Sequence, residues 1–251
     1  MKTYGLIGYR LGHSFSKGYF TQKFSNENIS DCVYQNFELD AISEFPTLLT
    51  NNPTIQGLNC TIPYKKDVMV YLDEIDEEAA QIGAVNVIKV TRTTEGVKLK
   101  GYNSDAFGFE MSLKPLLQTQ HQKALVLGTG GAAQAVVFIL QKLGLEVTIV
   151  SRNANPSKGI ISYEQLTPEV MTSHKLIVNA TPVGTFPNIS ECPNIPYKRL
   201  TSEYYLYDLI YNPELTTFLK QGKERGSIIK NGGDMLRLQA ERAWEIWEGN
   251  Y

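Results

Sequence analysis

Lys65 is a candidate for proton transfer. It lies in the segment GLNCTIPYKK at residues 57–66. Pro63 fits the first turn of a helix, and a helix that begins there would place Lys65 in the same turn. The positive end of a helix dipole disfavours a second cation, so the lysine would release its proton more readily, which suits acid–base chemistry near neutral pH. The alternative is a surface lysine whose ammonium group is simply hydrated.

A glycine-rich turn follows four apolar residues at 124–127. The sequence GTGGAA at residues 128–133 matches G-x-G-x-x-G/A. In that pattern the first glycine permits a tight turn, the second lets the backbone approach a pyrophosphate, and the small last residue lets a helix pack on a strand. The following helix N-terminus offers free N–H groups to phosphate. The context predicts dinucleotide binding, and a strand-to-helix turn without a ligand is the alternative.

The residues after the next expected strand bear on which dinucleotide binds. A carboxylate about 20 residues beyond the glycines would bind the ribose 2′-hydroxyl of NAD. After Val150 the chain instead reads Ser151-Arg152-Asn153, with Lys158 following. An arginine suits a 2′-phosphate, so the sequence favours NADP over NAD. The alternative is that Arg152 is a solvated loop cation.

Polar residues in the first half are candidate substrate contacts. Ser14 and Ser16 stand in the motif GHSFS. Hydroxyls spaced by two in a strand-to-helix loop can converge on a carboxylate or a polyol, although they are also a common helix N-cap pair. Asn86 interrupts an apolar strand-like segment, and Asp105 opens a helix-like one, where a carboxylate is favourable to the dipole alone. The structural alternatives therefore stay open for these residues.

The elements that must position these residues follow from hydrophobic periodicity. In the first half, the pattern predicts strands at residues 3–9, 32–38, 55–58 and 85–90, helices at 17–28 and 41–51, and a hairpin near 94–96. In the second half, it predicts strands at 124–127, 146–150, 175–179 and 204–208, and helices at 105–117, 132–143 and 233–248. Strands that alternate with helices indicate parallel βαβ units.

A seam between two α/β lobes is expected near residues 102–104, where Gly, Asn and Ser cluster before a helix. Ligand clefts favour such interfaces. The last predicted helix has an apolar stripe at helical spacing, formed by Leu236, Ala240, Ala243 and Trp247. Gln239 lies beside this stripe, and a polar side chain there needs a partner, for which substrate is one possibility.

Composition excludes several classes of protein. The 251 residues are 42% apolar and 20% charged, which is ordinary globular usage. Lys and Arg total 24 against 26 Asp and Glu, and the net charge of −2 argues against nucleic-acid and membrane-surface partners. Residues 124–141 carry no charge and are long enough to span a bilayer. The glycines and Gln134 within them favour a strand, a turn and a helix instead.

Cysteine and histidine usage predicts a cytoplasmic protein without a metal. Three cysteines, odd in number and far apart, argue against a disulfide framework or a zinc site. The histidines have no ligand spacing either. Arg10 interrupts the only apolar stretch at the N-terminus, so no signal peptide is expected. These cysteines and histidines are Cys32, Cys60, Cys192, His13, His121 and His174.

The chain resembles the shikimate dehydrogenase family, which includes shikimate and quinate dehydrogenases. Eight short motifs in the family's order carry the resemblance: GHSFS, GLNCTIPYKK, GAVNVI, GYNSDAFG, LGTGGAA, NATPVG, DLIYNPELTTFL and NGGDMLRLQ. It implies an α/β fold of two lobes. The first is a substrate-binding domain at residues 1–103, completed by the C-terminal helix 233–251. The second is a Rossmann-like NADP-binding domain with a parallel sheet at residues 104–232.

The resemblance also implies a reaction and site residues. NADPH would reduce the C3 ketone of 3-dehydroshikimate, in the pathway to chorismate and aromatic amino acids, with Lys65 and Asp105 as the catalytic pair. Substrate contacts are implied for Ser14, Ser16, Thr61, Asn86, Tyr211 and Gln239. Cofactor contacts are implied for Gly128, Thr129, Gly130, Gly131, Ala132, Ser151, Arg152, Asn153, Leu209 and Gly232, with Glu77 as a weaker candidate.

Two other functions compete with this interpretation. One is a relative acting on quinate or an amino analogue, with NAD in place of NADP. The other is a homologue that senses a ligand without turnover, against which the retention of both Lys65 and Asp105 argues. We expect a monomer or a homodimer with a small-molecule substrate.

Overall fold

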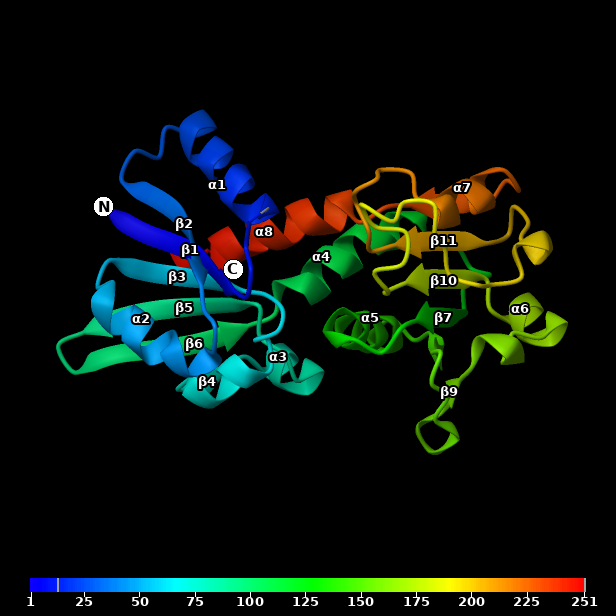
Figure 1. Ribbon diagram of the computed structural model, residues 1–251, viewed down its shortest axis with the longest axis horizontal. Coiled ribbons are helices and arrows are strands. Elements are labelled where there is room, and N and C mark those ends of the chain that lie inside the picture. The colour runs from blue at the N-terminus through cyan, green and yellow to red at the C-terminus, as the bar shows by residue number, and fades with distance from the viewer. Residues whose placement is uncertain (13, 251) are drawn as a thin grey trace. The chain divides into compact units, whose positions relative to one another are not determined.

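The computed structural model describes residues 1–12 and 14–250, which form two compact units (Figure 1). The first unit comprises Met1–Ser104 together with the C-terminal residues from Gln239, and the second comprises Asp105–Leu238. His13, within the GHSFS motif, lies outside the described residues. Helix α8 (Gly233–Glu248) contributes residues to both units.

The first unit is built on a mixed six-stranded sheet with the order β2-β1-β3-β5-β6-β4. Its strands are β1 (Lys2–Gly8), β2 (Cys32–Glu38), β3 (Ile55–Cys60), β4 (Glu74–Ile75), β5 (Val87–Thr93) and β6 (Gly96–Tyr102). The expected parallel pairing holds for β1 with β2 and β3. Strand β5 runs antiparallel to both β3 and β6, and the hairpin expected near residues 94–96 turns the chain from β5 directly into β6.

Helices cover both faces of this sheet. They are α1 (Phe15–Asn26), α2 (Phe45–Asn51), α3 (Glu77–Ile82) and the last turns of α8, with short 3-10 helices η1 (Ile42–Glu44) and η2 (Asp67–Tyr71). Side chains alternate along β1, so Ile7 joins a core with Phe45 of α2, whereas Tyr4 joins another with Phe20 of α1 and Trp247 of α8.

The C-terminal helix is anchored to the first sheet through Trp247. Its indole Nε1 donates a hydrogen bond to the Ile88 carbonyl at 3.1 Å, and its ring stacks on Tyr4 with centroids 5.0 Å apart. Ala240 and Ala243, which lie earlier on the same helix, are also buried, as the apolar stripe predicts. The end of the chain therefore completes the core of the unit that its beginning forms.

The second unit has an all-parallel sheet with the order β12-β11-β10-β7-β8-β9. Its strands are β7 (Lys123–Leu127), β8 (Glu146–Val150), β9 (Ile160–Ile161), β10 (Leu176–Asn179), β11 (Tyr205–Asp208) and β12 (Ile228–Lys230). The predicted Rossmann-like parallel sheet is confirmed. From the central strand β7, the chain first adds β8 on one side and later β10 on the other. Ligands of such sheets bind where the order reverses, beyond the carboxyl ends of the strands.

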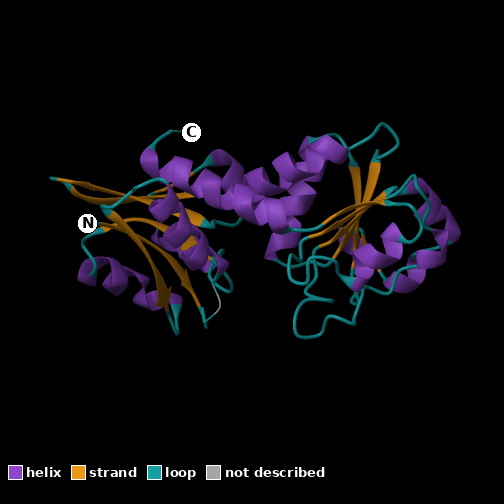
Figure 2. Cartoon of the chain, turned by 90° about the horizontal axis from the view of Figure 1, so that it is seen from above, coloured by secondary structure: helices purple, strands orange, loops and turns teal. Residues whose placement is uncertain are grey.

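Helices lie on both sides of this sheet (Figure 2). They are α4 (Ser104–Leu113), α5 (Gly131–Lys142), α6 (Pro168–Ser173), α7 (Thr217–Lys223) and the start of α8, with 3-10 helices η3 (Lys114–Leu116), η4 (Pro156–Lys158), η5 (Tyr163–Gln165) and η6 (Tyr197–Arg199). The helix expected at 105–117 ends as α4 at Leu113. Pro115 lacks the N–H that an α-helix interior needs, so the tighter η3 follows.

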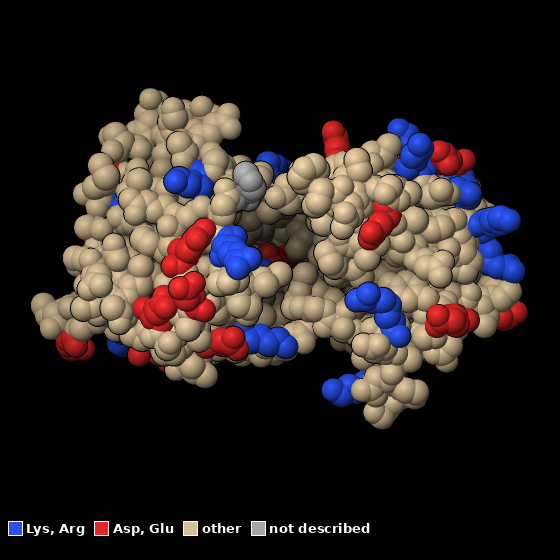
Figure 3. All heavy atoms as spheres, in the orientation of Figure 1, with Lys and Arg blue, Asp and Glu red and all other residues tan. Residues whose placement is uncertain are grey.

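The distribution of charged side chains on the surface and the hydropathy of the helices agree with the near-zero net charge and the ordinary composition of the sequence. Cationic and anionic side chains are interspersed on the face of each unit that Figure 3 shows. Of the helices in the described part of the chain, none combines the length and the apolar character needed to cross a bilayer. The uncharged residues 124–141 form β7, the glycine turn and most of α5, as predicted.

Candidate active site

The glycine turn connects β7 to α5 at the sheet's carboxyl edge. Gly128 has a φ of 109° and donates its N–H to the Val150 carbonyl at 2.8 Å, and a Cβ here would press on the Ala180 carbonyl and Thr181. Gly130 is the N-cap of α5 and supplies no side-chain cap. The first N–H groups of a twelve-residue helix are therefore available to an anionic ligand.

A pocket of about 560 Å³ opens at this edge of the second unit. Its walls come from the glycine turn, from the loop after β8, from η5, from the loop after β10 and from residues 192–194. The residues are Gly128, Thr129, Gly130, Ser151, Arg152, Tyr163, Glu164, Ala180, Thr181, Pro182, Val183, Cys192, Pro193 and Asn194. The structure thus brings five of the sequence-predicted cofactor residues to one cavity.

The loop after β8 carries the cation of this pocket. The Ser151 N–H donates to the Ile161 carbonyl at 2.9 Å, and Ser151 Oγ accepts from the Asn153 N–H at 3.2 Å. Arg152 is exposed and lines the pocket together with Tyr163. Burial raises the pKa of Tyr163, and the charge of the Arg152 guanidinium opposes that shift. A fixed turn with an arginine at the rim can bind a phosphate group.

A buried polar cluster joins the ends of β10 and β11. Asn179 Nδ2 donates to Asp208 Oδ1 at 3.0 Å, and Asn179 Oδ1 accepts from the Thr181 N–H at 3.1 Å. Asp208 also accepts from the Ile210 N–H at 3.1 Å and the Thr216 hydroxyl at 2.6 Å. Burial raises the pKa of Asp208 to about 6, against the effect of these donors. The cluster fixes the loop that carries Thr181 into the pocket.

Sequence reasoning did not single out Asn179, Asp208 or Thr216. The available signal was that NATPVG and DLIYNP both begin with a polar residue at the end of an expected strand. Parallel neighbours would bring those ends together.

Leu209 and Gly232, two predicted cofactor residues, meet in the second unit. The Gly232 N–H donates to the Ile210 carbonyl at 3.0 Å, and a Cβ at Gly232 would overlap the Leu209 carbonyl, so only glycine fits. Tyr211, a predicted substrate residue, follows in the same loop and is 44% exposed.

In the first unit, buried polar side chains connect several predicted substrate residues. Asn86 Oδ1 accepts from the Ser104 N–H at 2.7 Å, and its Nδ2 donates to Ser104 Oγ at 3.1 Å. Ser104 Oγ in turn donates to Gln239 Oε1 at 3.3 Å. Asn86 is 3% and Gln239 8% exposed. The partner that Gln239 needs is therefore supplied in part by the protein.

A second part of this network leads to α1. Tyr34 donates to Asn59 Oδ1 at 2.7 Å, and Asn59 Nδ2 donates to the Asn86 carbonyl at 3.3 Å. Burial raises the pKa of Tyr34, and a hydrogen bond with Ser16 opposes the shift. Tyr34, Asn59 and Asn86 thus belong to one polar network. Ser14 is the N-cap of α1, where its Oγ accepts from the Lys17 N–H at 3.3 Å, which is the structural alternative left open above.

The prediction that a helix begins at Pro63 is wrong. Residues 62–66 form turns, and the short η2 begins only at Asp67. The Lys65 carbonyl accepts from the Val85 N–H at 2.8 Å, because this segment bonds to the chain entering β5 rather than to its own next turn. The helix-dipole argument for Lys65 therefore does not apply. The Lys65 side chain is half-buried. Four residues earlier in the chain, the Thr61 N–H donates to the Ile7 carbonyl at 3.0 Å.

Asp105 and Glu77 occupy the starts of helices. Asp105 is the second residue of α4 and the first residue of the second unit, and it is half-buried. Glu77 is the first residue of α3 and is exposed, and its Oε1 accepts from Gln81 Nε2 at 3.3 Å.

The described histidines, His121 and His174, lie next to polar groups of the protein, and the cysteines form no disulfide. His121 accepts from the Gln118 N–H at 3.0 Å, and His174 lies 3.1 Å from Thr148 Oγ1. Burial lowers the pKa of both histidines. The three cysteines are free thiols. Over residues 1–12 and 14–250, no group of three His, Cys, Asp or Glu side chains is placed to hold a metal ion.

Known proteins match this chain over nearly its whole length. Residues 6–88 match the family described as shikimate dehydrogenase substrate binding domain. The chain is 35% identical, over 98% of its length, to shikimate dehydrogenase (NADP(+)) of Caldicellulosiruptor saccharolyticus, of which 92% is covered. It is 36% identical, over 99% of its length, to the protein of the same name from Carboxydothermus hydrogenoformans, again with 92% covered.

A solved structure agrees with these matches. Shikimate 5-dehydrogenase from Thermus thermophilus, in complex with NADP(H) and shikimate, has a TM-score of 0.84 and 31% identity, covering 99% of this chain and 94% of that one. The similarity therefore extends over both units.

Proposed function

The chain belongs to the shikimate dehydrogenase family, and we propose on this premise that it catalyses the reversible, NADPH-dependent reduction of 3-dehydroshikimate to shikimate. This is a step toward chorismate and the aromatic amino acids. The observation that carries the proposal is the pocket beyond β7, where an uncapped helix N-terminus and an arginine face one cavity.

The pocket residues fit NADP. The glycine turn leaves the backbone N–H groups at the start of α5 open to a pyrophosphate. At Gly128 the backbone passes close to Ala180 and Thr181, and a Cβ there would take up the space between them. Arg152 suits a 2′-phosphate, and the residues directly after β8 include no carboxylate to hold a free ribose hydroxyl. The residues that would hold the cofactor are Gly128, Thr129, Gly130, Gly131, Ala132, Ser151, Arg152, Asn153, Leu209 and Gly232.

When bound, NADPH supplies the hydride for the carbonyl carbon. Lys65 donates a proton to the developing alkoxide oxygen and recovers it in the reverse direction, and Asp105 orients the pair. General acid catalysis of this kind contributes about 10²–10⁴ in rate. Ser14 and Ser16 bind the substrate carboxylate, and Thr61, Asn86, Tyr211 and Gln239 surround the ring hydroxyls. The hydrogen bonds that fix Asn86 and Gln239 before substrate binds support this assignment, because they hold both side chains in one orientation.

The proposal is tested by mixing purified protein with NADPH and 3-dehydroshikimate and following the loss of nicotinamide absorbance. We expect stoichiometric oxidation of NADPH and formation of shikimate. Absence of turnover, with binding of both compounds retained, would instead favour a ligand-sensing homologue.

We further propose that the protein acts in the cytoplasm as a monomer or a homodimer. The three free thiols suit a reducing compartment. Sedimentation velocity of the purified protein distinguishes the two oligomeric states, and a larger assembly would contradict this part of the proposal.

A further inference from the structure

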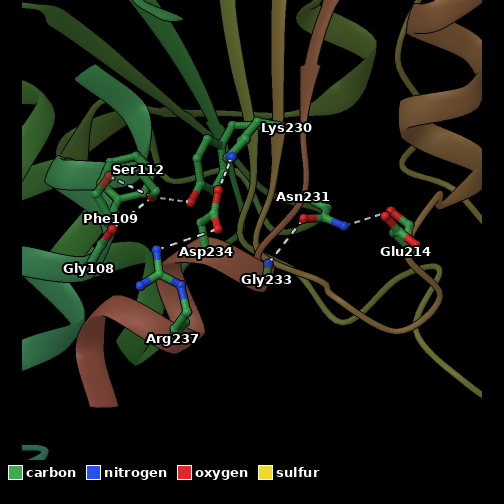
Figure 4. Close-up of polar contacts among 10 residues, drawn as sticks. Gly108, Phe109, Ser112, Glu214, Lys230, Asn231, Gly233, Asp234 and Arg237 are labelled. Carbon is green, nitrogen blue, oxygen red and sulfur yellow. Dashed lines mark hydrogen bonds and ion pairs between the residues drawn. The ribbon is translucent and has the colours of Figure 1, made fainter. Parts of the chain in front are cut away.

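Hydrogen bonds join two segments of the second unit, one of which carries Leu209 and the other Gly232, both proposed cofactor residues. Figure 4 shows the side-chain contacts between the two segments. One is the loop after β11, residues 209–216, which we call the β11 loop. The other is the turn between β12 and α8, residues 231–233, which we call the β12–α8 turn. The hydrogen bond from the Gly232 N–H to the Ile210 carbonyl, at 3.0 Å, joins them at one point.

Asn231 joins them at a second point. Its Nδ2 donates to the Glu214 carbonyl at 3.0 Å, and its Oδ1 accepts from the Gly233 N–H at 3.1 Å. Figure 4 shows the amide of Asn231 between these two groups. One side chain therefore bonds to the backbone of both segments, at a point further along the β11 loop than the contact of Ile210 with Gly232.

Ion pairs near Asn231 are weaker candidates for holding the two segments together. Asp234 lies between Lys230 and Arg237, in contact with the first and 3.9 Å from the second (Figure 4). The Asp234 side chain is 47% and that of Arg237 53% exposed. Solvent-exposed pairs of this kind contribute little to holding a backbone, whereas bonds to the main chain fix its position directly.

The ends of the β11 loop are held independently of Asn231. Asp208 accepts from the Ile210 N–H at 3.1 Å and from the Thr216 hydroxyl at 2.6 Å, and the Phe186 N–H donates to the Asn212 carbonyl at 3.2 Å. Glu214 lies between these attachments, at the part of the loop that Asn231 contacts.

We propose that Asn231 is a positioning residue: through the Glu214 carbonyl and the Gly233 N–H it holds the β11 loop and the β12–α8 turn in register, so that Leu209, Gly232 and Tyr211 present a fixed surface to the bound molecules. The inference rests on the proposed function for the identity of those molecules. It concerns the backbone that carries the contacts, and no ligand contact is assigned to Asn231 itself.

Two substitutions separate this role from simple helix capping. Asn231→Asp keeps an oxygen for the Gly233 N–H but replaces the donor toward Glu214 by a carboxylate. Asn231→Ala removes both bonds. A residue that only caps α8 would tolerate Asp, because Asp is as good an acceptor as Asn at that position. A positioning residue would tolerate neither change. Asn188→Asp, at an exposed loop residue, controls for the added charge.

The first measurement is backbone hydrogen exchange of the ligand-free full chain, which needs no activity. We expect exchange in residues 209–216 to quicken about 3- to 10-fold in both Asn231 variants, as the loss of one such hydrogen bond predicts, and to stay unchanged in Asn188→Asp. The second is the KM for NADPH and for 3-dehydroshikimate, each expected to rise about 3- to 10-fold in both Asn231 variants with a smaller change in kcat.

The outcomes are distinguishable. Unchanged exchange in both Asn231 variants, or wild-type exchange in Asn231→Asp alone, overturns the positioning role whether or not the protein is active. Quickened exchange with unchanged KM values also overturns it, because the held backbone would then not matter for binding. Quickened exchange in a protein whose wild type shows no turnover supports the structural role and contradicts the proposed function.

Discussion

Asn179 and Asp208 share a hydrogen bond of 3.0 Å that joins the carboxyl ends of two neighbouring parallel strands. Both side chains are fully buried. The amide orients the loop that carries Thr181 into the pocket, and the carboxyl holds the β11 loop through Ile210 and Thr216. A single buried pair therefore connects the two loops that follow β10 and β11.

The carboxyl of Asp208 makes stability depend on pH. Burial raises its pKa from 3.8 to about 6, so the folded state favours the protonated form. The resulting stabilisation is complete below the unfolded pKa and is lost as the pH rises through about 6. Between about pH 4 and pH 7, we expect the free energy of unfolding of the wild type to fall by about 2 kcal/mol relative to Asp208→Asn. Urea unfolding at several pH values measures this, and parallel profiles would contradict it.

Arg152 is expected to select the cofactor. Arg152→Ala should raise the KM for NADPH about 10- to 100-fold, because a charge-assisted contact to the 2′-phosphate is lost, with little effect on the KM for NADH. Lys158→Ala is the matched control, since it removes an exposed cation outside the residues that line the pocket. Equal effects of Arg152→Ala on both cofactors would mean that the guanidinium does not contact the 2′-phosphate.

Trp247 is expected to stabilise the first unit more than its neighbour Trp244. Trp247→Phe leaves the buried Ile88 carbonyl without its indole donor and opens space in the core. Trp244→Phe changes the same ring in the same cluster, where it is only partly buried. We predict that the first variant loses about 1–2 kcal/mol more in free energy of unfolding than the second. Equal losses in chemical denaturation would show that the hydrogen bond contributes nothing.

Lys65 is expected to act in the chemical step. Lys65→Ala should lower kcat about 100-fold or more, while the dissociation constant of shikimate changes less than about tenfold. Lys66→Ala, at the exposed neighbouring lysine, should stay close to the wild type. Near-normal turnover of Lys65→Ala would remove this residue from the mechanism.

The all-parallel sheet was predictable because most residues of its inner strands are apolar and the strands alternate with helical segments. Strands β7, β8, β10 and β11 each lie within one residue of the expected bounds. The glycine turn was predictable because it stands between the apolar residues 124–127 and a helix that carries no charge before Lys142. Short elements such as α6 and α7, with six and seven residues, carry too little periodicity to be recognised.

The parts of the site that depend on contacts between distant segments were not predictable. Asn179 and Asp208 are 29 residues apart, and their pairing requires knowing that β10 and β11 are neighbours. Lys65 shows the opposite failure. Local pattern favoured a helix from Pro63, but the hydrogen bond from Val85 to the Lys65 carbonyl holds the segment in turns. The candidate role of Lys65 therefore rests on the family resemblance and not on a helix dipole.

If the proposed function is right, this chain oxidises shikimate with NADP in the reverse direction. The most direct test is the initial rate of nicotinamide reduction by the purified wild type with shikimate or quinate, each combined with NADP or NAD. We expect rapid reduction with shikimate and NADP and much slower reduction in the other three mixtures. Reduction that is fastest with quinate or with NAD would contradict the proposed specificity, and no reduction in any mixture would contradict the enzymatic function itself.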